Sequence, residues 1–113
     1  MDNVFHKILR GEIPAKIEYE DDECFVIKDI SPKAPVHLLV IPKKELESIG
    51  QMTNEDTSLI GNLTLVATQM AKKFGIGDAF KIVINSGEDA GQSVMQLHIH
   101  VLGGWKHKPK EEI

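Results

Sequence analysis

The chain has 113 residues, which suits one domain with a modest core and leaves too little for a second, so we expect a single domain over 1–113. Hydrophobic residues make up 42% and charged residues 27% of the chain, proportions that exclude a disordered or fibrous protein. The net charge of −4 argues against a nucleic-acid carrier, because such proteins usually present a basic face to phosphates.

The N-terminal part of the chain predicts a short helix followed by a hairpin. Apolar residues at helical spacing predict a helix over 4–9, which Gly11 ends. Segments 15–20 and 23–28 are separated by two aspartates, and the second is rich in β-forming residues. The single cysteine, Cys24, lies in that apolar second segment, where we expect a buried free thiol and no disulfide within the chain.

The middle of the chain predicts a buried strand and then a long helix. Segment 36–41 is apolar at all positions but one and ends at Pro42, as expected for a central strand covered on both faces. Thr53 and Asp56 have the spacing of a capping box, and Gly75 ends the helical pattern. The apolar positions between them recur at steps of three and four: Leu59, Leu63, Val66, Ala67, Met70 and Phe74.

The C-terminal part predicts two further strands and a tail. The strands cover 80–85 and 95–102, and a polar glycine-containing loop joins them. Five strands with one long helix between the third and fourth indicate an α+β fold, a five-stranded antiparallel sheet covered on one face by helix. The tail 105–113 lacks periodic apolar residues, so we expect it to be weakly structured.

The chain shows no sign of membrane insertion or export. Its N-terminus has no apolar signal core, and no apolar run approaches the roughly 18 residues that a membrane span needs. We therefore expect a cytoplasmic protein with no membrane partner.

Two histidines alternate along the last predicted strand. Because alternate strand residues share a face, Gln96, His98 and His100 are expected to point one way while their apolar neighbours face the core. Histidine is an unusual choice for a solvated strand face, although two alternating histidines can be incidental. The residues alone leave a reactive site and an ordinary polar face both open.

The loop before these histidines has groups that suit an anion. Segment 85–93 contains two glycines that permit a tight curve, backbone amides that can converge, and the hydroxyl of Ser93. Such a loop can cradle a phosphate. The alternative is a polar hairpin loop whose glycines only allow the turn.

Two more polar residues need an explanation. His37 lies within an otherwise apolar strand, where it must find a hydrogen-bond partner, either a core carbonyl or a ligand. Asp29 stands beside a serine and a proline, where it either organises a turn or accepts hydrogen bonds from paired sugar hydroxyls.

Together these segments resemble the histidine-triad (HIT) nucleotide-binding family, and within it the purine nucleoside phosphoramidases. The similarity extends over nearly the full chain. Its strongest segments are 11–16, 29–32, 34–37, 40–44, 91–94 and 97–104.

The resemblance implies a homodimer in which two five-stranded sheets join, a purine nucleotide substrate in each subunit and no cofactor. By position, His98 is the expected nucleophile, and His100 is the expected ligand of the phosphate under attack. His37 completes the histidine cluster, and Ser93 binds the phosphate or leaving group.

The resemblance also assigns the nucleotide-binding residues. Asp29 is expected to hold the ribose hydroxyls, Asn85 the phosphate or leaving group, and three apolar residues the base. The full expected set is Phe5, Ile8, Ile27, Asp29, Asn85 and Gly91.

The implied reaction proceeds through a covalent intermediate. A neutral nitrogen of His98 attacks the α-phosphorus, an amine or similar group leaves, and water then releases the nucleoside monophosphate. The leaving amine needs a proton, which Ser93 or a neighbouring histidine relays.

The sequence departs from the family pattern at two places. Gln96 stands where the first histidine of the triad is expected; glutamine cannot titrate near neutral pH but keeps an orienting role, so we expect a slower, competent enzyme. Paired cysteines that bind zinc in some relatives correspond here to Asn3 and His6, so no zinc is expected there.

Two other functions remain open from the sequence. His98, His100 and His37 can supply three imidazole ligands to a hydrolytic metal. The chain can also be a nucleotide-binding partner protein with weak or no catalysis, because Gln96 replaces a histidine.

Overall fold

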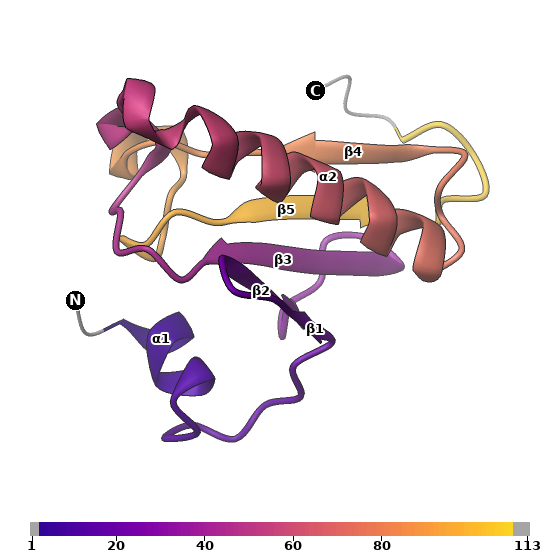
Figure 1. The fold of residues 1–113 in the computed structure, drawn as a ribbon. Helices are drawn as coiled ribbons and strands as arrows, with labels where there is room; N and C mark the ends of the chain where they lie inside the picture. The colour runs from indigo at the N-terminus through magenta and orange to yellow at the C-terminus, as the bar shows by residue number, and fades with distance from the viewer. Residues whose placement is uncertain (1–2, 110–113) are drawn as a thin grey trace.

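The computed structural model describes residues 3–109 and contains a five-stranded antiparallel sheet with one long and one short helix (Figure 1). The expected α+β arrangement is confirmed. The elements in chain order are α1 (Val4–Leu9), β1 (Tyr19–Glu20), β2 (Cys24–Lys28), β3 (Val36–Pro42), α2 (Thr57–Lys73), β4 (Phe80–Val83) and β5 (Ile99–Gly103). The strands lie in the order β1-β2-β3-β5-β4, with β3 in the centre.

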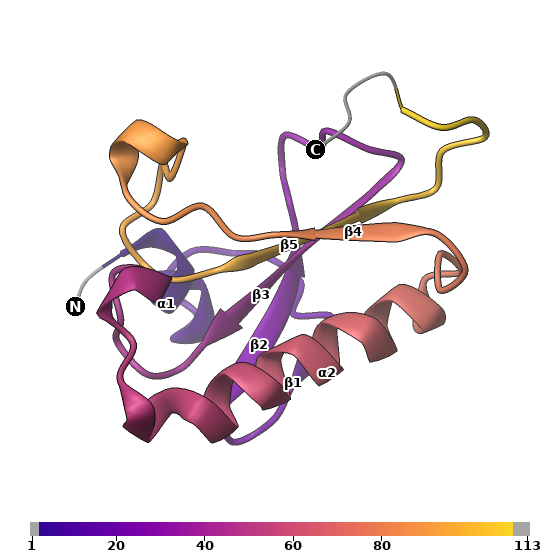
Figure 2. The same cartoon turned by 90° about the horizontal axis from the view of Figure 1, so that it is seen from above.

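Helix α2 packs along one face of the sheet, and α1 lies near the other (Figures 1 and 2). The apolar side of α2 meets one side of β2, β3 and β5 in the larger core cluster, which includes Leu63, Val40 and Ile99. A smaller cluster joins Phe5 of α1 to Phe25 and to other residues on the opposite side of β2 and β3. Both faces of β3 are therefore covered, as its apolar sequence predicts.

The long helix begins with the capping box expected from the sequence. The Thr53 side chain accepts from a backbone N–H in the first turn, and the Asp56 side chain accepts from the Thr53 N–H at 2.9 Å. The first turn, Asn54–Asp56, is a 3₁₀ helix, so α2 itself starts at Thr57. Gly75, with φ of +78°, ends the pattern in a left-handed conformation that glycine adopts without strain.

The strand that carries the histidines is shorter than the sequence predicts. The pairing of Val40 with Ile99 would bring Pro42 opposite Leu97, and proline has no backbone N–H for the ladder. β5 consequently starts at Ile99, and Gln96 and His98 precede it.

The expectation that Gln96 shares a strand face with the histidines is therefore wrong. Leu97, Ile99 and Val101 do face the core as predicted.

Other boundaries differ at the ends of elements. Of the predicted strand 15–20 only Tyr19–Glu20 pairs, and the predicted strand 80–85 ends at Val83. Residues 105–109 form no helix or strand, and the rest of the predicted tail, 110–113, lies outside the described residues. Among residues 3–109 no helix has both the length and the apolar character needed to cross a membrane.

Candidate active site

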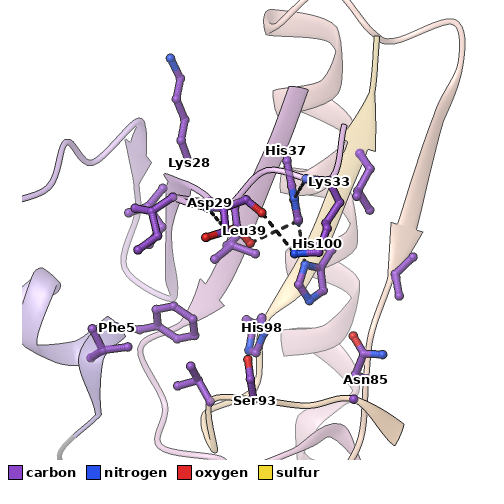
Figure 3. Close-up of a pocket in the computed structure, with 18 of the residues that line it drawn as sticks. Phe5, Lys28, Asp29, Lys33, His37, Leu39, Asn85, Ser93, His98 and His100 are labelled. Atoms are coloured by element: carbon purple, nitrogen blue, oxygen red, sulfur yellow. Dashed lines mark hydrogen bonds and ion pairs between the residues drawn. The ribbon is translucent and has the colours of Figure 1, made fainter. Parts of the chain in front are cut away.

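A pocket of about 550 Å³ opens on the sheet face away from α2, where the paired positions Leu39 of β3 and His100 of β5 lie. It is lined by all ten residues that were expected to react or to bind nucleotide: Phe5, Ile8, Ile27, Asp29, His37, Asn85, Gly91, Ser93, His98 and His100. Figure 3 shows His37, His100 and His98 in succession across it, with Phe5 on one side and Asn85 on the other. Gln96 is not one of the lining residues.

The apolar end of the pocket is formed by α1 and the adjacent strands. The N-cap Asn3 accepts from the His6 N–H at 3.0 Å and starts a helix that directs Phe5 towards the sheet. Phe5 is 6% exposed and meets the ring of His98 edge-on, with 4.9 Å between the ring centroids. Aliphatic side chains of β2 and β3, including Ile27, complete a surface suited to the flat face of a base.

His98 is held in one tautomer by the main chain. Its Nδ1 lies 2.7 Å from the carbonyl oxygen of Gln96, and a carbonyl can only accept, so Nδ1 carries the proton. The lone pair is therefore on Nε2. His98 is 6% exposed and lines the pocket, so its ring is held in one orientation there.

His37 and His100 form a hydrogen-bonded pair whose direction is also set by the main chain. The N–H of Lys33 donates to His37 Nδ1 at 3.0 Å, so the proton of neutral His37 is on Nε2. His37 Nε2 lies 2.8 Å from His100 Nδ1 and donates to it. His100 must then carry its own proton on Nε2, which makes that nitrogen a hydrogen-bond donor.

Burial keeps these two histidines uncharged. The pKa of His100 is lowered from its ordinary 6.5 to about 4, chiefly by desolvation and in smaller part by the neighbouring His98 and His37. The pKa of His37 is also lowered, chiefly by burial, against the opposing influence of the Asp29 carboxylate. The pocket thus holds a neutral histidine pair near neutral pH, in which His100 Nε2–H is the remaining donor.

Asp29 follows β2 and uses its two carboxylate oxygens differently. Oδ1 accepts from the Ser31 N–H at 2.8 Å, so the turn predicted from the sequence is present. Oδ2 lies 3.4 Å from His37 Nε2, inside the pocket. Asp29 therefore organises the turn and also lines the pocket.

In the loop over 86–94, side chains are available to a ligand, whereas several backbone amides are not. The N–H groups of Gly87, Ala90, Gly91 and Gln92 all bond within the loop, which removes them from the expected amide cradle. Gly91 has φ of +92°, where a side chain would be strained, and the Asn85 amide donates to the Ala90 carbonyl of the same loop at 2.8 Å. The exposed Ser93 lines the pocket beside His98 (Figure 3).

The donor groups fit a metal poorly. Within the described chain, the group close enough to share an ion is Asp29, His37 and His100, with ligand atoms within 4.8 Å of one another. His98, the third ligand of the metal alternative, is not in that group. In addition, His37 Nε2 carries a proton as long as the Lys33 N–H occupies Nδ1, so its lone pair is not available.

Sequence reasoning missed several residues of the pocket. Leu102 and Val83 form its wall at the β4 side, and the alternation of Leu102 with His100 along the strand is a signal that would have found the former. The N–H of Lys33, which sets the His37 tautomer, has no sequence signal because any non-proline residue has one.

Comparison with known proteins places the chain in a family. The HIT domain model matches residues 10–107. The chain belongs to the HIT domain family. It is 53% identical over 103 residues to an uncharacterised HIT-like protein of Synechocystis sp., covering 91% of this chain and 90% of that protein.

Solved HIT structures share the fold. A HIT family hydrolase from Clostridium thermocellum superposes with a TM-score of 0.91 at 37% identity, covering 96% of each chain. A histidine triad protein from Clostridium difficile gives a TM-score of 0.88 at 38% identity, covering 98% of this chain and 97% of that one. The chain therefore has the nucleotide-binding fold of HIT family hydrolases.

Proposed function

We propose that this HIT protein is a nucleoside phosphoramidase or a closely related nucleotidyl hydrolase. It cleaves an activated α-phosphate of a purine nucleotide through a nucleotidyl-histidine and releases the nucleoside monophosphate. The observation that carries the proposal is the 2.7 Å contact from His98 Nδ1 to the Gln96 carbonyl, which leaves the Nε2 lone pair of a pocket histidine free to attack.

The distribution of apolar and polar groups in the pocket suggests one orientation for a bound purine nucleotide. The purine lies against Phe5 and Ile27, with Ile8 on the helix side, and the ribose hydroxyls reach Asp29. This orientation would put the α-phosphate at the part of the pocket where His98 and Ser93 lie side by side (Figure 3). Its remaining partners are the His100 Nε2–H, the Ser93 hydroxyl, the Asn85 amide and the loop at Gly91.

The reaction has two steps. His98 Nε2 forms a bond to phosphorus as the bond to the leaving amine breaks, and the amine takes a proton that the exposed Ser93 hydroxyl relays from solvent. Water then attacks the phosphorus and passes its proton back through Ser93 to solvent, and the P–N bond to His98 breaks so that neutral His98 is recovered. The neutral donor His100 stabilises the charge on the phosphate oxygens in both steps.

The position of Gln96 supports an active enzyme over a nucleotide-binding protein that has no turnover. Its side chain does not line the pocket, so replacing the first histidine leaves unchanged the groups that would touch the phosphate. This is the reason to prefer a competent enzyme over the alternative of a binding partner with weak or no turnover.

The proposal includes a homodimer. β4 is an edge strand of the sheet, with only β5 beside it among the described residues, and Ile82 on it is 37% exposed. Pairing of two β4 edges would join the sheets and cover this apolar residue. The buried free thiol of Cys24 fits the reducing cytoplasm that we propose as the location.

The test is capture of the covalent intermediate. An adenosine phosphoramidate labelled at phosphorus is mixed with the protein, and the denatured chain is mapped for label. We expect label on His98, and His98→Ala should lose it together with at least about three orders of magnitude in kcat/KM. His107→Ala, which changes an exposed histidine outside the pocket, is the matched control.

The same assay separates the alternatives. Turnover by His98→Ala at the rate of the parent would refute the nucleophile. The metal hydrolase would be favoured if activity is lost when divalent metals are removed and returns when they are added. The binding protein would be favoured by tight nucleotide binding without turnover.

A further inference from the structure

The segment that carries the proposed reactive groups is tied to the chain that follows β3. The Leu97 N–H donates to the Leu46 carbonyl at 2.7 Å. Two buried glutamines reach the same stretch of backbone: Gln92 Nε2 donates to the Glu47 carbonyl at 2.5 Å, and Gln96 Nε2 to the Lys44 carbonyl at 3.2 Å. Side-chain amides therefore tie segment 92–98 to the chain after β3 at two separate points, Gln92 and Gln96.

Gln96 is placed deep in the protein. It is fully buried, and its Nε2 also lies 3.5 Å from the Pro42 carbonyl. Among the described residues, its Oε1 has no hydrogen-bond partner. An unpaired buried oxygen lowers stability, so whatever this glutamine contributes has to come from its amide N–H groups, which meet the Lys44 and Pro42 carbonyls.

The main chain of the same residue orients the proposed nucleophile. The Gln96 carbonyl accepts the Nδ1 proton of His98 at 2.7 Å. In water a histidine side chain favours the tautomer with the proton on Nε2, which would block attack from that nitrogen. The carbonyl of Gln96 therefore has to be in the right place for Nε2 to be the free one.

We infer that Gln96 is a positioning residue: its side-chain amide anchors the Lys44 and Pro42 carbonyls, and thereby holds its own backbone carbonyl where it selects the reactive tautomer of His98. The inference rests on the proposed role of His98 as nucleophile. It assigns Gln96 no proton transfer, because the side chain does not line the pocket and does not titrate.

Three variants isolate this role. Gln96→Met keeps the length of the side chain and removes both amide N–H groups. Gln96→His keeps one ring N–H that can reach a backbone carbonyl, so it is the conservative rescue. Gln92→Met removes a buried glutamine that binds the same backbone stretch without touching the residue whose carbonyl meets His98, and it is the matched control.

The first measurement does not depend on activity. Long-range proton–nitrogen correlation spectra of the imidazoles at neutral pH report which ring nitrogen of His98 carries the proton. Each variant is measured at a temperature well below the midpoint of its own thermal unfolding. We expect Nδ1 to be protonated in the parent, in Gln96→His and in Gln92→Met. In Gln96→Met we expect a substantial share of the Nε2-protonated form.

The second measurement is steady-state kinetics with the adenosine phosphoramidate. Gln96→Met should lower kcat by about 10- to 100-fold while KM changes by no more than about twofold, because the nucleotide contacts are unaltered. Gln96→His should restore kcat to within about threefold of the parent, with a pH–rate profile of unchanged shape.

Three results would overturn the inference. The first is a Gln96→Met variant in which neither the His98 tautomer nor kcat changes. The second is a tautomer shift in Gln92→Met equal to that in Gln96→Met. The third is a new ionisation in the pH–rate profile of Gln96→His, which would make position 96 a proton-transfer site. If the parent forms no His98 adduct, the proposed function fails, whereas an adduct with an indifferent Gln96→Met refutes only the positioning role.

Discussion

The histidines of the pocket are oriented by main-chain groups more than by each other. The Lys33 N–H sets the tautomer of His37, His37 then sets that of His100, and the Gln96 carbonyl sets that of His98. Each ring is therefore committed to one donor and one acceptor before a ligand arrives. A site of this kind reacts without first rearranging its protons, which lowers the barrier to the chemical step.

The neutral state of His100 has a consequence for stability. Its pKa falls from 6.5 to about 4 on folding, so between these pH values the unfolded chain binds more protons than the folded one. The contribution of neutral His100 to the free energy of unfolding should therefore be fully present above pH 6.5. It should decrease as the pH falls towards 4. His37, whose pKa is also lowered, acts in the same direction.

Urea titrations at pH 7 and pH 5 test this expectation. The difference in unfolding free energy between the two pH values should shrink in His100→Gln, which cannot titrate there. It should persist in His107→Gln, where the substituted histidine is exposed. Equal pH dependence of the parent and His100→Gln would contradict the lowered pKa.

Helix α2 shows how an element is stabilised by one face. Leu63 is fully buried against the sheet, whereas Leu65, two positions along, is 55% exposed. Leu63→Ala should reduce the free energy of unfolding by about 2–5 kcal/mol, because it removes buried methyl groups and leaves a cavity. Leu65→Ala, the control on the same helix, should change it by no more than about 0.5 kcal/mol.

Urea unfolding followed by far-ultraviolet circular dichroism measures both variants. Similar losses in the two variants would mean that the outer face of α2 is covered by something else, such as a second subunit. That outcome would move the proposed interface from β4 to the helix.

The edge strand β4 governs the assembly that we propose. In solution the protein should have about twice the 12.6 kDa mass of the chain, measured by sedimentation equilibrium. Ile82→Lys should shift it towards monomer, since pairing of two β4 edges would bring like charges together. Leu65→Lys, an equally charged change on the outer face of α2, should leave the mass unaltered, and a monomeric parent would disprove the dimer.

The fold and the membership of the pocket were largely readable from the sequence. Helix 4–9, the capping box at Thr53 and the buried run from His37 each depend on local spacing, which the chain carries on its own. The residues expected to bind or react all line one pocket, but it was the resemblance to the HIT family that assigned them. Strand alternation by itself pointed only to a shared face for His98 and His100.

Only the tertiary structure decided where strand β5 begins, where Gln96 points and which nitrogen of each histidine carries a proton. All three depend on partners distant in the sequence: Pro42 interrupts the ladder opposite Leu97, the Lys44 carbonyl receives the Gln96 amide, and backbone groups bond the imidazoles. A sequence specifies periodicity along the chain, but hydrogen-bond partners across the fold are fixed only when the strands pair in register.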